Sequence, residues 1–316
     1  MQLLFDQLQT LINDADKVLF VSHKNPDPDT VGGALALGKF VEAQNKKVNY
    51  FCLNKIPNNF FFLNGVEKFT NENIFSDNYD LIIFIDCSEV SRCGSNDLLK
   101  NKKAFWINID HHVDKERIVG LTIRDSKASA ACEIVYKFLK HTDFFIDPNT
   151  ASALLAGILI DTNFLSNSAT KGESVVIAGE LSAFGADYRS ILKSFYFNKN
   201  QEILKVWGLA LGRLKHDKEK DVITTAIFKD DIGDDKDLNE AMEGFSNFLN
   251  TVLMSNVVMV LREYDEGVRG NIRTSGNDTD VSKIAEEYGG GGHRRAAGFM
   301  CNGRLVEEEN GWRVEK

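Results

Sequence analysis

Two apolar segments that end in acidic or imidazole side chains constrain the fold of this chain most strongly. The segment 81–85 leads directly to Asp86, and the run from Ala104 to Ile109 leads to Asp110-His111-His112. Continuous apolar runs of this length are typical of strands covered on both faces, as in a parallel sheet. Ligands bind outside the carboxyl ends of strands in such sheets, so we expect these polar residues to face a common site.

The surrounding pattern predicts an α/β fold. Strand-like runs are expected at 17–22, 48–52, 81–85 and 105–109. Helix-like segments are expected at 1–16, at about 31–43, from an N-cap at Ser129 to 139, and from Asp147-Pro148 to about 160. An aspartate followed by proline is a common way to begin a helix. Strands that alternate with helices indicate a doubly wound, mostly parallel sheet.

The length of 316 residues favours two domains over one core. We expect a catalytic domain over 1–185, a helical and then highly charged linker over 186–221, and a smaller α+β domain over 222–316. In the smaller domain, strands are expected at 222–228 and 257–263, a helix at 244–253, and another helix that ends near Tyr288.

Composition narrows the function classes. The net charge of −9 argues against a protein that coats long nucleic acid, but not against a small phosphorylated substrate. No apolar run reaches the roughly 20 residues that span a bilayer, and the acidic start is unlike a signal peptide. The five cysteines are odd in number and lack C-x-x-C spacing, so we expect a reduced cytoplasmic protein without a disulfide framework.

A third polar station follows the first expected strand. The segment Ser22–Thr30 reads SHKNPDPDT, and its prolines bias the residues before them toward extended backbone. His23, Asp27 and Asp29 can then point into one space at the carboxyl end of the strand. Asp29 or Thr30 would cap the next helix, whose N-terminus favours phosphate oxygens. Taken alone, this loop is equally compatible with a solvated turn.

Charge repulsion argues that these stations hold metal ions. Asp161 adds an acid at the end of an apolar helix, where a negative charge is unfavourable unless a cation compensates. Four carboxylates (Asp27, Asp29, Asp86 and Asp161) about 5 Å apart would repel by roughly 3 kcal/mol per pair, whereas two divalent cations cancel four negative charges. Carboxylate and imidazole ligands suit Mn²⁺ best, with Mg²⁺, Co²⁺ or Fe²⁺ as alternatives.

Near the C-terminus, four glycines precede His293-Arg294-Arg295. Glycines let a backbone approach an anion closely and present its N–H groups, and the adjacent arginines add positive charge. The alternative is a turn after a helix, where glycine is common. Because four glycines exceed what a helix end requires, we favour anion binding.

In their order along the chain, these motifs resemble those of the DHH-family phosphoesterases. The motifs are the HKNPDPD segment, Asp86, Asp110-His111-His112 and Asp161, and the segment 289–298 (GGGGHRRAAG) resembles the DHHA1 domain. The layout is most similar to bacterial nanoRNases and pAp phosphatases. The stretch 268–275 departs from the R-x-S-like stretch of the family.

The resemblance implies a role for each site residue. His23 and Asp27 would hold one metal ion, and Asp86 would bridge both. The second ion would be held by Asp29, His111 and Asp161. Two candidate catalytic residues remain: Asp110 would orient its neighbours, and His112 would bind the substrate phosphate or protonate the leaving oxygen. In the second domain, the residues expected to grip the substrate are Arg273, Gly290, Gly291, Gly292, His293 and Arg294.

The implied activity is hydrolysis of short oligoribonucleotides such as pApA to mononucleotides, of pAp to AMP, or of both. A metal-activated water would attack phosphorus in the cleft between the domains. The expected partners are short RNA or nucleotides, without a long nucleic-acid scaffold or a membrane, and a homodimer is left open. Three alternatives remain: a RecJ-like exonuclease, a pyrophosphatase-type phosphohydrolase, and a nucleotide-binding sensor without catalysis.

Overall fold

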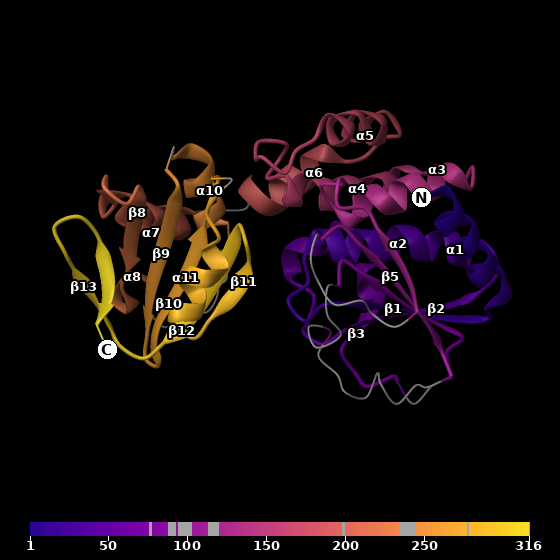
Figure 1. Ribbon diagram of the computed structural model, residues 1–316, viewed down its shortest axis with the longest axis horizontal. Coiled ribbons are helices and arrows are strands. Elements are labelled where there is room, and N and C mark those ends of the chain that lie inside the picture. The colour runs from indigo at the N-terminus through magenta and orange to yellow at the C-terminus, as the bar shows by residue number, and fades with distance from the viewer. Residues whose placement is uncertain are drawn as a thin grey trace. The chain divides into compact units, whose positions relative to one another are not determined.

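The computed structural model divides the chain into two units, Met1–Phe195 and Tyr196–Lys316 (Figure 1). We refer to them as unit 1 and unit 2. The structure describes residues 1–75, 78–87, 93, 103–112, 120–197, 200–233, 244–253, 255–276 and 278–315. No helix in these ranges is long and apolar enough to cross a membrane.

Unit 1 is built on a six-stranded sheet in the order β3-β2-β1-β4-β5-β6. The strands are β1 (Lys17–Ser22), β2 (Lys47–Cys52), β3 (Phe69–Thr70), β4 (Leu81–Ile85), β5 (Phe105–Asp110) and β6 (Leu121–Arg124). Every neighbouring pair is parallel. This confirms the predicted parallel α/β architecture.

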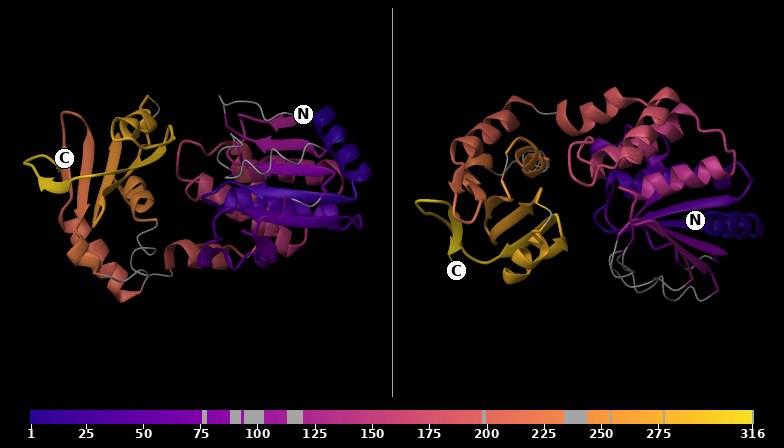
Figure 2. Two further views of the ribbon diagram at one scale, coloured as in Figure 1. Left: turned by 90° about the horizontal axis from the view of Figure 1, so that it is seen from below. Right: turned by 45° about the horizontal axis from the view of Figure 1, so that its top comes forward.

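The side chains of β1 alternate between the two faces of this sheet. Val18 and Phe20 join the core beneath the helices, whereas Leu19 and Val21 join a second buried cluster with Phe84. Within the described residues, the helices of unit 1 from α1 (Gln2–Asp14) to α5 (Gly172–Ala183) all contribute residues to the core that contains Val18 and Phe20. Figure 2 shows these helices against the sheet. The helices of unit 1 are α1 (Gln2–Asp14), α2 (Pro28–Glu42), α3 (Ala131–His141), α4 (Pro148–Asp161), α5 (Gly172–Ala183) and α6 (Tyr188–Leu192). Two 3-10 helices, η1 (Asn58–Phe60) and η2 (Val66–Lys68), are shorter. The π-helix η5 (Lys193–Phe197) spans the division between the two units.

Two helix starts differ from the prediction. Asp27, not Asp29 or Thr30, caps α2: its Oδ1 accepts the N–H of Asp29 at 3.1 Å and that of Thr30 at 3.0 Å. Since proline fits the first helical position, α2 begins one residue after Asp27. For α3 the cap is Ala130, and the Ser129 hydroxyl instead donates to Glu133. The predicted cap of α4 is confirmed, because Asp147 accepts the N–H of Thr150.

Unit 2 contains a six-stranded mixed sheet in the order β11-β12-β10-β9-β8-β7. Its strands are β7 (Lys215–Asp217), β8 (Val222–Ile227), β9 (Val257–Tyr264), β10 (Gly267–Arg273), β11 (Gly291–His293) and β12 (Ala296–Cys301), and β13 (Arg304–Glu307) pairs with β14 (Trp312–Glu315). Its helices are α7 (Gln201–Gly212), α8 (Lys229–Ile232), α10 (Phe245–Val252) and α11 (Val281–Glu287). The smaller α+β architecture is therefore confirmed. β7 lies within the charged segment predicted as a linker and pairs with β8.

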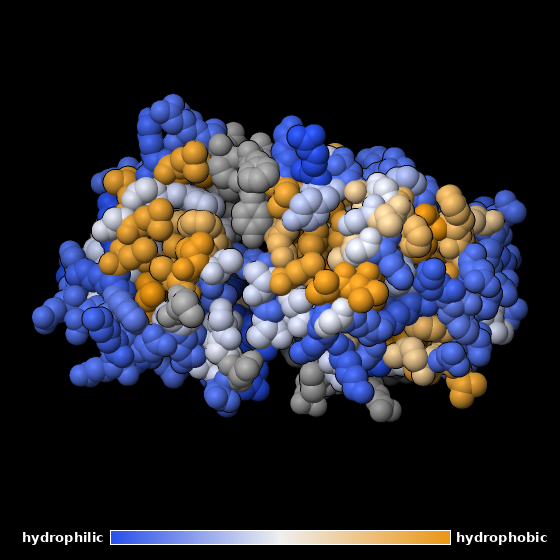
Figure 3. Space-filling view, turned by 90° about the horizontal axis from the view of Figure 1, so that it is seen from above, coloured by the Kyte–Doolittle hydropathy of each residue, from blue (hydrophilic) through white to orange (hydrophobic). Residues whose placement is uncertain are grey.

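Unit 2 has its own cores on the two sides of its sheet. Residues of α7 and α10 pack in one cluster, which includes Trp207 and Phe245, whereas α11 packs in another with Phe299. Several large apolar side chains stay exposed, among them Phe145 of unit 1 and Leu204 of unit 2. Orange areas of apolar surface lie among polar surface in Figure 3.

Candidate metal centre

The predicted site residues of unit 1 gather where the strand order of its sheet reverses. β1 lies between β2 and β4, and ligands bind outside the carboxyl ends of strands at such a point. His23 directly follows β1, and Asp86 directly follows β4. Asp110 is the last residue of β5. The parallel sheet thus brings together segments that are far apart in the sequence.

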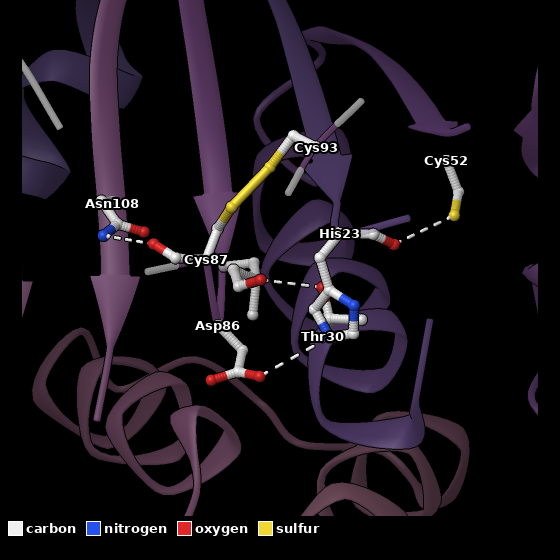
Figure 4. Close-up of a disulfide and its surroundings, with 8 residues drawn as sticks. His23, Thr30, Cys52, Asp86, Cys87, Cys93 and Asn108 are labelled. Carbon is white, nitrogen blue, oxygen red and sulfur yellow. Dashed lines mark hydrogen bonds and ion pairs between the residues drawn. A yellow bond between two sulfur atoms is a disulfide. The ribbon is translucent and has the colours of Figure 1, made fainter. Parts of the chain in front are cut away.

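Asp86 lies between histidines from two strands. His23 Nε2 is 3.7 Å from Asp86 Oδ2 and 3.4 Å from Asp27 Oδ2, and Figure 4 shows the His23 ring facing Asp86. On the other side, His111 Nε2 is 3.4 Å from Asp86 Oδ1 and 3.2 Å from Asp161 Oδ2. Asp86 therefore connects His23, which follows β1, with His111, which follows β5, and His111 in turn contacts Asp161 at the end of α4.

Three groups of side chains are close enough to share a cation. In each group the candidate ligand atoms lie within 4.8 Å of one another. The groups are His23, Asp27 and Asp86; Asp29, His111 and Asp161; and Asp86, His111 and His112. All six predicted metal ligands occur in these sets. His112, to which the family resemblance gives a role toward the substrate, joins the third group.

Asp29 is anchored by the first turn of another helix. It is fully buried, and its two carboxylate oxygens accept the backbone N–H groups of Ala131 at 2.7 Å and Cys132 at 2.8 Å. A helix N-terminus favours negative charge. Because each carboxylate oxygen has two lone pairs, these bonds orient Asp29 and leave lone pairs for a cation.

The backbone of Asp86 is in the left-handed region, with φ of +54°. Its N–H donates to Ile109 O at 2.9 Å, which ties the turn after β4 to β5. Non-glycine residues in this region are uncommon and often occur at functional sites. The strained turn directs the Asp86 carboxylate toward the histidines.

The protein's own charges favour different protonation states across the site. Burial would raise the pKa of Asp86, but hydrogen bonds from His111 and His112 outweigh burial and hold that pKa well below its usual range. Burial would likewise lower the pKa of His111, but Asp161 and Asp86 raise it well above its ordinary value. Asp86 is therefore the anion around which the site is organised.

Two other carboxyl groups resist ionisation. Burial and the nearby negative charge of Asp161 raise the pKa of Asp29 well above its usual range. Burial raises the pKa of Asp161 to about 6, although His111 opposes the increase. A buried carboxylate cluster that resists ionisation fits a cation site, because bound cations supply the missing positive charge. The donor set of carboxylates and imidazoles therefore suits divalent metal ions.

Asp110 lies behind His112 and does not belong to any of the three groups. Its Oδ1 is 2.7 Å from His112 Nδ1 and accepts the His112 backbone N–H at 3.2 Å. Its Oδ2 accepts a hydrogen bond from Arg124 Nη2 at 3.1 Å. Arg124, the last residue of β6, was missed by the sequence reasoning because nothing in the sequence indicates that β6 lies beside β5.

The expectation about cysteines is wrong for one pair. Cys87 forms a disulfide with Cys93 (Figure 4). Both side chains are buried in the second core cluster of unit 1, which brings their sulfur atoms together. The Cys87 carbonyl also accepts a hydrogen bond from Asn108 Nδ2 at 2.9 Å.

The predicted substrate residues of unit 2 lie at the end of β10 and in the segment that runs from the turn after α11 through β11 to Arg294. Arg273 ends β10; its Nε donates to Asn247 Oδ1 at 2.7 Å, and burial lowers its pKa to about 10. The glycine run has two structural roles. Gly289, with φ of +76°, ends the turn after α11, whereas a Cβ at Gly290 would lie 2.6 Å from Phe299 Cα of β12.

The rest of the glycine run is strand, not a loop. Gly291 and Gly292 belong to β11, which pairs antiparallel with β12. Close packing explains the glycine at 292, where a Cβ would lie 2.6 Å from Ala297 Cα of β12, whereas nothing lies within 4 Å of a Cβ at Gly291. Arg294 follows this strand and is exposed. The side chain of His293 lies outside the described part of the structure.

Each unit matches the model of a known protein family. The DHH family N-terminal domain matches residues 17–158, and the DHHA1 domain matches residues 219–310. A bifunctional oligoribonuclease and PAP phosphatase NrnA of Thermus thermophilus is 26% identical over 302 residues, covering 92% of this chain and 86% of that protein. The protein of the same name from Bacillus subtilis is 22% identical over 286 residues, covering 90% of this chain and 88% of that protein.

A solved structure extends the likeness to the fold of nearly the whole chain. The crystal structure of an exopolyphosphatase-related protein from Bacteroides fragilis superimposes with a TM-score of 0.88 at 25% sequence identity. The superposition covers 96% of this chain and 92% of that protein.

Proposed function

We propose that this chain, which belongs to the DHH family and carries a DHHA1 domain, is a metal-dependent phosphoesterase for short oligoribonucleotides, for pAp, or for both. Its relatives named as oligoribonucleases and PAP phosphatases support a hydrolase that acts on phosphate esters. One observation carries the proposal. Asp86 and His111 each belong to two of the three groups of side chains that are close enough to share a cation, so the three groups form one connected site.

We assign the metal ligands as the family resemblance implies. His23 and Asp27 would hold one ion, Asp29, His111 and Asp161 would hold a second, and Asp86 would serve as a ligand to both. When bound, two divalent cations lower the pKa of water toward neutrality and neutralise charge on the phosphoryl oxygens. We infer Mn²⁺ as the preferred ion, because mixed carboxylate and imidazole ligands suit it.

His112 is proposed to act on the substrate. Burial would lower its pKa, but hydrogen bonds to Asp110 and Asp86 raise that pKa to about 9. A protonated imidazole carries one proton on each ring nitrogen. Because Asp110 holds the proton on Nδ1, the proton on Nε2 is the one that His112 can deliver. We therefore assign His112 to protonating the leaving oxygen as the bond from phosphorus to that oxygen breaks and a water oxygen bonds to phosphorus.

The substrate class follows from charge. The overall charge of −9 disfavours long nucleic acid, while a small substrate with two anionic groups can use both the metal centre and a separate basic group. We propose that Arg273, Gly290–Gly292, His293 and Arg294 bind the second group.

A substrate panel tests this function. With Mn²⁺ present, we expect kcat/KM for pApA, a five-residue oligoribonucleotide or pAp to exceed kcat/KM for pyrophosphate and for long single-stranded DNA. A preference for pyrophosphate would support the pyrophosphatase-type alternative. A preference for long DNA would support the RecJ-like alternative. Binding of pAp without turnover of any substrate would support the sensor.

A further inference from the structure

A cation outside the predicted ligand set lies directly behind the candidate catalytic histidine. Arg124 ends β6 and is in register with Asp110 at the end of β5. Arg124 Nη2 donates to Asp110 Oδ2 at 3.1 Å. Asp110 is fully buried, while the Arg124 side chain retains 21% of its exposure. Arg124 is neither a residue of the DHH-family motifs nor a proposed metal ligand.

The ion pair gives Asp110 a fixed orientation. A buried carboxylate is costly unless it is paired and hydrogen-bonded. Arg124 engages one oxygen, so the other oxygen faces His112 and accepts both its backbone N–H and a hydrogen bond involving Nδ1. Because the two strands are in register, the pair joins backbone positions that are already held by the sheet.

Two carboxylates compete for the same nitrogen of His112. His112 Nδ1 lies 2.7 Å from Asp110 Oδ1 and 3.2 Å from Asp86 Oδ1. If Asp110 moved or lost its charge, Asp86 would become the main partner of this nitrogen and would turn the ring toward the metal ligands. The charge and position of Asp110 therefore decide which way the His112 ring faces.

We propose that Arg124 is a positioning residue that holds Asp110 so that the His112 ring is directed toward the leaving oxygen. This inference rests on the proposed function. In that reaction a water molecule loses a proton to solvent as its oxygen bonds to phosphorus, and the bond to the leaving oxygen breaks. A proton moves from His112 Nε2 to the leaving oxygen, and solvent returns a proton to His112. A poor leaving group needs that proton, whereas nitrophenolate leaves without it.

The test compares two leaving groups in Arg124→Met, a substitution that removes the charge and keeps much of the side-chain length. With Mn²⁺ present, kcat and KM are measured for pApA, which releases a ribose hydroxyl, and for bis(p-nitrophenyl) phosphate. We expect kcat for pApA to fall at least about tenfold with KM nearly unchanged, and kcat for the nitrophenyl ester to change by less than about threefold. Arg124→Lys should restore part of the loss.

Lys137→Met is the matched control. Lys137 is also a cation of unit 1 and pairs with Asp125, the residue after Arg124, at 3.2 Å. We expect this variant to treat the two substrates as the wild type does. In a His112→Asn background, Arg124→Met should cause little further loss on pApA, because the group that it positions is absent.

The outcomes separate this inference from the proposed function. Equal losses on both substrates, or full additivity with His112→Asn, would overturn the positioning role. A higher KM with unchanged kcat would show that Arg124 contacts the substrate directly and would also overturn it. If Arg124→Met does not fold, Arg124→Lys replaces it in the test. We then expect a smaller loss of kcat for pApA and no loss of kcat for the nitrophenyl ester. A wild-type protein that hydrolyses neither of these substrates nor pAp would instead reject the proposed function.

Discussion

Asp86 combines a strained backbone with contacts to three imidazole rings. Its left-handed φ of +54° costs on the order of 1–3 kcal/mol for a residue other than glycine. The cost is tied to its position, since the turn places the carboxylate within 3.7 Å of His23, 3.4 Å of His111 and 3.2 Å of His112. A residue that served only to end a strand would not require this combination.

Replacing Asp86 tests its proposed bridging role. We expect Asp86→Ala to abolish both metal binding and activity, because the variant removes the carboxylate common to two of the ligand groups. Metal stoichiometry by calorimetry and by elemental analysis measures the first effect. Asp86→Asn is the matched control for folding, because asparagine tolerates left-handed backbone. An Asp86→Ala protein that still holds two ions would contradict the assignment.

His112→Asn should separate chemistry from metal binding. We expect the variant to keep its metal content and to lose at least about a hundredfold in turnover of pApA, as is typical when a general acid is removed. Single-turnover kinetics with Mn²⁺ measures the loss. Turnover near that of the wild type would exclude His112 as the proton donor, and loss of metal would place it among the ligands.

The pKa of His112 also predicts how the metal-free protein responds to pH. Its pKa of about 9 exceeds the ordinary value of about 6.5, so its stabilising contribution is complete below about pH 6.5 and is lost as pH rises toward 9. The contribution is on the order of 3 kcal/mol. Urea unfolding in the presence of EDTA should show a free energy of unfolding that declines across this range, and His112→Asn should flatten the decline.

At the scale of secondary structure, the site depends on how closely three helices pack. The first turn of α2 carries Asp29, which binds the first turn of α3. Gly157 of α4 faces both, because a Cβ there would approach Cys132 Sγ and lie 2.8 Å from Asp29 Oδ1 and 2.9 Å from its Cα. The absence of a side chain at Gly157 therefore lets α4 support the position of a proposed ligand.

Gly157→Ala should disturb the metal centre through packing alone. The added methyl group must displace Asp29 or α4, and we expect a loss of roughly 1–3 kcal/mol in the free energy of unfolding, as for other overpacked cores, together with weaker metal binding. Gly179→Ala in α5 is the control, because nothing lies within 4 Å of its Cβ. It should stabilise the protein by up to about 1 kcal/mol. Equal effects of the two variants would contradict the packing argument.

Sequence reasoning succeeded where burial dominated and failed where pairing between distant segments mattered. β1 and β4 were predicted with their exact bounds because both are buried apolar runs. β7 was missed because Lys215–Asp217 is charged and forms a strand only through its pairing with β8. The role of Arg124 likewise depends on the register of β5 and β6, which no local pattern encodes.

At the scale of the whole molecule, the two units have separate cores and separate parts of the proposed site. The predicted metal ligands all lie within Met1–Phe195, whereas Arg273 and the glycine run lie within Tyr196–Lys316. A substitution in unit 2 should therefore change substrate affinity without changing the chemistry of unit 1. This separation gives different kinetic signatures for the two units.

Arg273→Ala tests this division. We expect KM for pApA to rise at least about tenfold, with little change in kcat/KM for bis(p-nitrophenyl) phosphate, because only binding of the second anionic group is removed. Metal stoichiometry should equal that of the wild type. Arg269→Ala is the matched control, since Arg269 lies on the same strand with an exposed side chain and has no proposed role. If Arg273→Ala lowered kcat/KM equally for both substrates, Arg273 would influence unit 1 itself, and the division of labour between the units would be wrong.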